Sequence, residues 1–163
     1  MISQLNFTFG SSSLLRDIAK KYPDRPFKLF VSSGENAQHA LFDLSGKENI
    51  FSSPIRLKVI KSAGADDLRG IVYYQSFKLS TDDEQIMRKK VTDLINDSQN
   101  VKGLNSILMC ERVGHSQLTI LISTWNSQKD LDQWLDSNEY APLLEFSARG
   151  PQNTYFSEKY TLS

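Results

Sequence analysis

Few side chains in this sequence can act as strong nucleophiles or as metal ligands. There is one cysteine, Cys110, and there are two histidines, His39 and His115, with no close spacing among the three. A dedicated zinc site needs several such ligands at short spacing, so no metal site is predicted. No nucleophile elbow, phosphate-binding loop or GxGxxG motif occurs. The acidic run at 82–84 is typical of a helix start and not of a catalytic pair.

The clearest local signals lie between residues 118 and 140. An apolar, β-branched run at 118–122 predicts a buried strand that closes at Trp125. Ser127 stands three residues before Asp130, a spacing that caps a helix start. An apolar face that includes Trp134 follows at helical spacing, and Tyr140 comes shortly after it. The stretch therefore predicts a strand ending in Trp125 and a capped short helix carrying Trp134.

The elements from residue 70 onward predict one folded unit. Strands are expected at 71–79, 104–113, 118–125 and 153–162, with helices from residue 81, after Ser127 and around 143–146. This β-α-β-β-α-(α)-β order is typical of a ferredoxin-like sheet with its helices on one face. The other face of such a sheet needs a partner to cover it.

The first 65 residues form a smaller, β-rich unit with one helix, from Ser11 to Pro23. A unit of this size is too small to be comfortably stable alone, so we expect it to pack on the rest. Small and acidic residues at 62–67 predict the linker. The fold class is therefore predicted as α+β: an N-terminal α/β unit at 1–65 packed on a ferredoxin-like domain at 66–163.

The strand-end Trp125, the Ser127 cap and Trp134 resemble the antibiotic-biosynthesis-monooxygenase (ABM) domain family. The likeness is strongest to its haem-degrading branch and to the related two-domain group named "target of RNAIII-activating protein", which have a similar N-terminal extension. The resemblance implies the dimeric α/β barrel superfamily, whose sheets pair to build a barrel. The pairing is expected either within one chain, giving a monomer, or between two copies, giving a homodimer.

The haem-degrading branch has an Asn on the first strand, a Trp at the end of the third strand and a His on the helix that comes after the second Trp. The resemblance places Gln75, Trp125 and Leu144 at these positions. Gln75 keeps the amide with a longer reach, whereas Leu144 cannot ligate iron. Gln75 and Trp125 are thus the catalytic candidates. Trp125, Tyr140 and Leu144 are the expected pocket lining.

Three functions remain open from the sequence. The first is an ABM-type protein resembling haem-degrading monooxygenases, with haem as the implied cofactor and its chemistry weakened or lost through Leu144. The second is a non-catalytic stress or signalling protein of the same fold that acts by binding. The third is a cofactor-independent monooxygenase acting on a small aromatic. The expected ligand is accordingly haem or a small hydrophobic or aromatic molecule.

Composition and charge limit the partners and the cellular compartment that we expect. The 163 residues are 39% hydrophobic with a net charge of +0 and a pI near 6.7, so no nucleic-acid partner is expected. The single cysteine agrees with a reducing compartment. The sequence shows neither a signal peptide nor an apolar run long enough to span a bilayer. We therefore expect a cytoplasmic protein without a transmembrane segment.

Overall fold

One closed β-barrel contains strands from both halves of the chain. The computed structural model describes residues 2–148 and 153–163. Within them the barrel order is β1-β3-β2-β8-β5-β7-β6-β4, and every neighbouring pair is antiparallel. The strands are β1 (Gln4–Gly10), β2 (Phe27–Ser32), β3 (His39–Asp43), β4 (Ile55–Gly64), β5 (Ile71–Lys78), β6 (Leu104–Arg112), β7 (His115–Trp125) and β8 (Thr154–Leu162).

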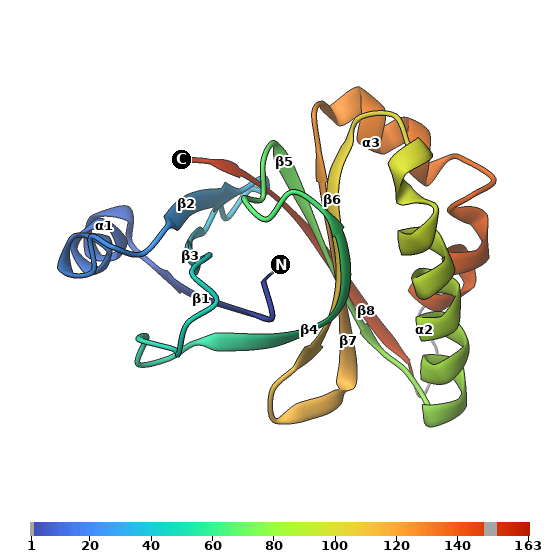
Figure 1. Cartoon of the computed structure of the whole chain (residues 1–163), viewed down its shortest axis with the longest axis horizontal. Helices are drawn as coiled ribbons and strands as arrows, with labels where there is room; N and C mark the ends of the chain where they lie inside the picture. The colour runs from blue at the N-terminus through green and yellow to red at the C-terminus, as the bar shows by residue number, and fades with distance from the viewer. Residues whose placement is uncertain (1, 149–152) are drawn as a thin grey trace.

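The helices lie outside the barrel on two opposite sides (Figure 1). One side carries α1; the other carries α2 and α3 over the sheet that contains β5 to β8. The helices are α1 (Ser12–Lys21), α2 (Thr81–Asn96), α3 (Gln128–Leu135) and the 3₁₀ segments η1 (Ser98–Asn100) and η2 (Ala141–Ser147). The hydroxyls of Ser11, Ser80 and Ser127 accept hydrogen bonds from amides in the first turns of α1, α2 and α3.

Alternation along the strands divides the core into two main clusters. On β5, Val72 and Tyr74 point into the barrel, while Phe77 packs under the helices. The barrel interior is aromatic: Phe7 and Phe42 stack with their ring centroids 4.4 Å apart. A third, smaller cluster lies beneath α1 around Leu15. The helix-side cluster positions the candidate site.

The N-terminal strands supply the cover that a ferredoxin-like sheet needs. β2 pairs with β8, and β4 pairs with β6, so the sheet pairing occurs within one chain. β4 continues to Gly64, which means that the first three residues of the predicted linker are strand. The predicted boundary at residue 65 therefore follows directly on a strand that belongs to the common barrel.

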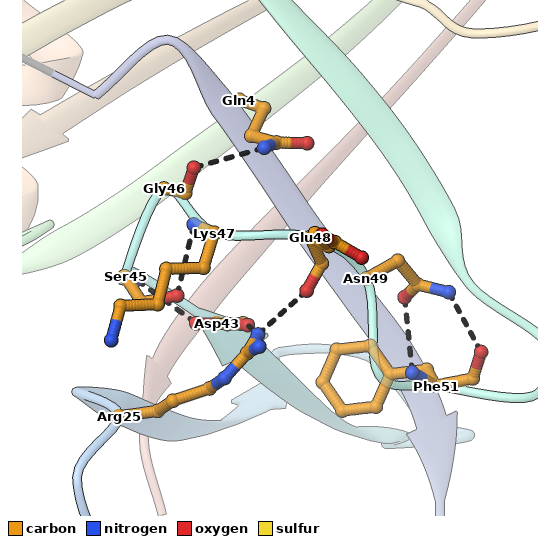
Figure 2. A network of polar contacts seen from close by, with 9 residues as sticks. All are labelled: Gln4, Arg25, Asp43, Ser45, Gly46, Lys47, Glu48, Asn49 and Phe51. Atoms are coloured by element: carbon orange, nitrogen blue, oxygen red, sulfur yellow. Dashed lines mark hydrogen bonds and ion pairs between the residues drawn. The ribbon is translucent and has the colours of Figure 1, made fainter.

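A network of polar contacts holds the loop after β3, with an ion pair at its centre and one hydrogen bond to β1 (Figure 2). The Arg25 guanidinium lies 2.6 Å from the Asp43 carboxylate and donates to the Glu48 carbonyl at 2.7 Å. The Gln4 amide of β1 donates to the Gly46 carbonyl at 2.9 Å. The Asp43 side chain is 1% exposed, so this pair is shielded from solvent on the carboxylate side.

Candidate functional site

Gln75 is the buried polar centre of the sheet face beneath the helices. It is 0% exposed, and its Nε2 donates to the hydroxyls of Tyr140 at 2.8 Å and Tyr155 at 2.9 Å. The Tyr155 hydroxyl also lies 3.3 Å from that of Tyr73. Among the described residues, the Gln75 Oε1 has no hydrogen-bond partner. A buried carbonyl oxygen without a partner is uncommon and is available to a ligand or a water.

Two tryptophans belong to the same helix-side cluster as Tyr140. Trp125 ends β7 with 0% exposure, and its Nε1 donates to the Ser123 Oγ at 2.9 Å. Its ring lies 5.1 Å from that of Trp134 on α3, and Trp134 lies 4.6 Å from the Tyr140 ring, measured between centroids. The Trp134 Nε1 has no partner within the described part of the chain. We call Gln75, Trp125, Trp134, Tyr140 and Tyr155 the aromatic layer.

Glycines fix the backbone around Trp125. Gly70 has a φ of 94°, and a Cβ there would overlap the Trp125 carbonyl oxygen. Gly103 has a φ of 80°; its carbonyl accepts from the Asn126 amide at 2.8 Å, and a Cβ on it would collide with the Asp130 side chain. Only glycine adopts these conformations at no steric cost. These close backbone contacts therefore fix the conformation of the turn from β7 into α3.

Two tyrosine hydroxyls, that of Tyr140 in the layer and that of Tyr73 beside it, are weak acids in the folded protein. Burial raises the pKa of Tyr140 to about 12, and this outweighs the opposing effect of the Gln75 hydrogen bond. Burial likewise raises the pKa of Tyr73, and its hydrogen bond to Tyr155 adds to the increase. At neutral pH both side chains are phenols, so neither is a general base.

Burial gives the protein an alkaline limit of stability. It raises the pKa of Tyr160 from 10.0 to about 12 and that of Cys110 from 9.0 to about 12. The folded state binds these protons more tightly, so their contribution is full below the unfolded pKa values and is lost as the pH rises through this window. We expect phenolate absorbance to rise together with loss of circular dichroism above about pH 10. Complete phenolate formation near pH 10 with an unchanged fold would contradict this.

Three of the four predicted site residues come together and one does not. Gln75 contacts Tyr140, and Trp125 reaches Tyr140 through Trp134. Leu144 is 52% exposed, whereas its neighbour Leu143 is 0% exposed. The reason is that η2 is a 3₁₀ segment, in which residues three apart share a face, and Leu143 and Phe146 take the buried one. Leu144 therefore does not line the layer.

A groove opens between α2 and the α3–η2 segment, which lie side by side on the helical face (Figure 1). Its volume is about 540 Å³, within the range of about 300–1,000 Å³ that ligand pockets have. Leu94, Val101 and Pro142 contribute apolar surface, and Trp134 of the aromatic layer lines it too. The groove was not foreseen from the sequence, because its walls come from segments about 40 residues apart.

The histidines lie elsewhere. His39 begins β3, on the N-terminal side of the barrel, and His115 begins β7, at the opposite end of that strand from Trp125. In residues 2–148 and 153–163, no three His, Cys, Asp or Glu side chains gather as a metal-binding group. No helix of these residues is both long and apolar enough to cross a membrane.

Solved structures with this architecture span nearly the whole chain. A haem-degrading enzyme from Listeria monocytogenes superimposes with a TM-score of 0.78 at 16% identity, covering 98% of this chain and 99% of that one. A ferredoxin-fold protein related to antibiotic biosynthesis monooxygenases, also from Listeria monocytogenes, gives 0.80 at 17%, covering 98% and 94%. A major regulator of staphylococcal pathogenesis gives 0.78 at 19%, covering 98% and 99%.

These similarities define the class of protein by fold. The sequence itself matches no family model and no curated protein. The predicted α+β, ferredoxin-like architecture is confirmed, and so is the predicted resemblance to ABM-type proteins at the level of the fold. What the neighbours do is a property of those proteins, so the function of this chain must be argued from its own site.

The residues of the aromatic layer do not fit a haem. Neither histidine nor cysteine belongs to the helix-side cluster, and burial keeps Tyr140 a phenol bound to Gln75. Met87 and Met109, whose sulfurs are soft ligands, are 0% and 2% exposed within the packed core. A haem needs an axial ligand reachable from an open slot. The layer offers packed aromatic rings instead.

Proposed function

We propose that this chain is a binding protein of the ABM-type fold, which takes a small planar aromatic molecule in the groove against Trp134. The observation that carries the proposal is a groove of about 540 Å³ lined by an aromatic ring whose Nε1 is buried without a partner. Aromatic rings prefer offset-stacked or edge-to-face contacts worth about 0.5–1.5 kcal/mol beyond burial alone. A buried indole N–H without a partner is uncommon in folded proteins, and Trp134 lines the groove.

The two enzymatic alternatives lack a required group in this layer. Haem degradation requires an iron ligand, which Leu144 cannot supply. Cofactor-independent oxygenation requires a base to deprotonate the substrate. The polar groups of the layer are the Gln75 amide, two indoles and the phenols of Tyr140 and Tyr155. Burial raises the pKa of Tyr140, so its phenol stays protonated at neutral pH. The binding function is the one these groups support.

The barrel also supports proposals about the oligomeric state and the compartment of the protein. Because β2 and β4 already close the sheet within one chain, we expect a monomer. Cys110 is buried as a free thiol inside the barrel, which fits a reducing compartment such as the cytoplasm. Sedimentation of the purified protein checks the first point: a dimer at micromolar concentration would contradict it.

Both tryptophans of the chain belong to the aromatic layer, so intrinsic fluorescence reports on the site directly. Titration with acridine, a neutral planar probe at pH 8, should quench this fluorescence saturably at one-to-one stoichiometry. Titration with haemin should give no saturable shift of the Soret band and no loss of the band after a reductant is added. A one-to-one Soret shift followed by decay of the band would overturn the proposal and restore the haem-degrading function.

Leu144→His is the matched control for the haemin titration. The Leu144 side chain is 52% exposed on the outer side of η2. A histidine at residue 144 therefore faces solvent and not the aromatic layer. We expect haemin binding to remain the same as in the parent protein. A sharp gain in haemin affinity would mean that η2 presents residue 144 to a haem site.

A further inference from the structure

The walls of the groove carry an excess of negative charge. Four carboxylates line it, those of Asp93, Asp97, Asp130 and Glu139, against the two ammonium groups of Lys90 and Lys102, which leaves a net charge of −2. An apolar groove with a charged rim of one sign concentrates ligands of the other sign. The excess therefore bears on which aromatic molecule the groove accepts.

Some of the charged side chains that line the groove already have partners within the chain, and others are free to meet a ligand. Lys90 is paired with Glu145 at 3.0 Å, and its Nζ lies 5.3 Å from the centroid of the Phe146 ring. Asp130 accepts a hydrogen bond from the Ser127 hydroxyl at 3.0 Å. In the described part of the chain, the side-chain carboxylates of Asp93, Asp97 and Glu139 take part in no hydrogen bond or ion pair. The three are exposed at the rim of the groove.

Two of these carboxylates stand where a helix disfavours them. Asp97 is the C-cap of α2, Asp93 lies one turn before it, and the last turn of α2 has no basic residue. The C-terminal end of a helix carries a partial negative charge, and like charges four residues apart repel each other. The pair therefore costs the folded protein stability that a nearby cation would restore.

We infer that the groove selects a planar aromatic ligand that carries a positive charge, with Trp134 against its ring and Asp93, Asp97 and Glu139 around its cationic group. The inference rests on the proposed function and names the class of its ligand. Among the aromatic side chains tryptophan attracts a nearby cation most strongly, and Trp134 lines the wall of the groove. The same carboxylates repel an anionic ligand, including a porphyrin with its propionate groups.

Three acridines of one ring size separate charge from shape. At pH 8, 9-aminoacridine is cationic, acridine is neutral and acridine-9-carboxylate is anionic. Calorimetric titration should give affinities in that order, with roughly a three- to tenfold step for each unit of charge at low salt. The triple variant Asp93→Asn/Asp97→Asn/Glu139→Gln changes the net charge of the groove lining from −2 to +1. It should therefore no longer prefer 9-aminoacridine, while it binds neutral acridine about as tightly as the parent does.

A control with the same change in net charge isolates the groove. The triple variant Asp17→Asn/Asp24→Asn/Glu35→Gln removes three carboxylates from the N-terminal part of the chain, none of which lines the groove. It should keep the order of the three affinities. If both triple variants keep the order, or if the parent shows none while acridine still binds, the charge inference is overturned and the proposed function stands. If none of the three probes binds, both are overturned.

Thermal unfolding gives a second readout. Because Asp93 and Asp97 oppose the electrostatics of α2, Asp93→Asn/Asp97→Asn should raise the melting temperature while it weakens 9-aminoacridine binding. A gain in stability together with a loss of affinity is the signature of residues kept for binding. A fall in melting temperature would show that the two carboxylates support the helix, which overturns the inference.

Discussion

Trp125→Ala should lower the free energy of unfolding by about 3–5 kcal/mol, the range for removing a large buried aromatic side chain. Trp125 is 0% exposed, its Nε1 donates to Ser123, and its ring supports Trp134. Its backbone is fixed by Gly70, so the surrounding chain cannot easily collapse into the cavity. The variant should also bind acridine more weakly, because Trp134 loses the ring on which it packs.

Equilibrium unfolding in urea, followed by circular dichroism, measures this loss without depending on the tryptophan signal. Phe156→Ala is the matched control: it also removes an aromatic ring from a strand, but one that is 52% exposed. We expect the control to change stability by less than about 1 kcal/mol. A similar small loss for Trp125→Ala would mean that the aromatic layer is loosely packed and that the groove extends into it.

The local parts of the site could be predicted from the sequence. Ser127 caps α3 by accepting from the Asp130 amide at 3.1 Å, as the spacing predicted, and the strand before it ends at Trp125. Gln75 and Tyr140 are 65 residues apart, yet the family resemblance placed both near one pocket, and the structure brings them to 2.8 Å. Whether they act on a ligand stays a prediction.

The features that the sequence did not place depend on helix type and on distant contacts. Leu144 was assigned by counting from the preceding helix, but η2 has a period of three, so the buried face falls on Leu143 and Phe146. The groove acids Asp93 and Asp97 were not singled out from the sequence, because acidic residues on an amphipathic helix are ordinary on its solvent-exposed face. Only the folded structure shows that Asp93 and Asp97 line a groove together with Trp134 and Glu139.

In the stretch at 62–67, pairing of the backbone with a neighbouring strand decides the secondary structure, although the residue types indicate a linker. Its small residues lack the apolar alternation of a strand, which is why they indicated a linker. In the barrel, Ser62 to Gly64 instead pair with β6 after a register shift between Val59 and Lys61. Gly64 has a φ of 92° beside the Asn105 carbonyl, a close approach that a Cβ would prevent. The backbone partner, and not the side chains, makes this segment a strand.

Arg25→Ala should lower the free energy of unfolding by about 3 kcal/mol, near the lower end of the range for breaking a buried ion pair. The variant leaves the Asp43 carboxylate, which is 1% exposed, without its cation, and the Glu48 carbonyl loses its donor (Figure 2). Since the loop from 44 to 51 also covers β1, we expect its amides to exchange with solvent faster. Urea unfolding and hydrogen exchange measure the two effects.

A second substitution identifies the cause of that loss. Arg25→Ala/Asp43→Asn should be more stable than the sum of the single losses predicts, because the double variant no longer buries an unpaired charge. Arg69→Ala is the control, because it breaks an ion pair on the surface. Arg69 and Asp67 lie 3.3 Å apart, but their side chains are 64% and 52% exposed. We therefore expect Arg69→Ala to change the free energy of unfolding by no more than about 1 kcal/mol. Strict additivity of Arg25→Ala and Asp43→Asn would show instead that Arg25 stabilises the loop through Glu48 and not through the charge of Asp43.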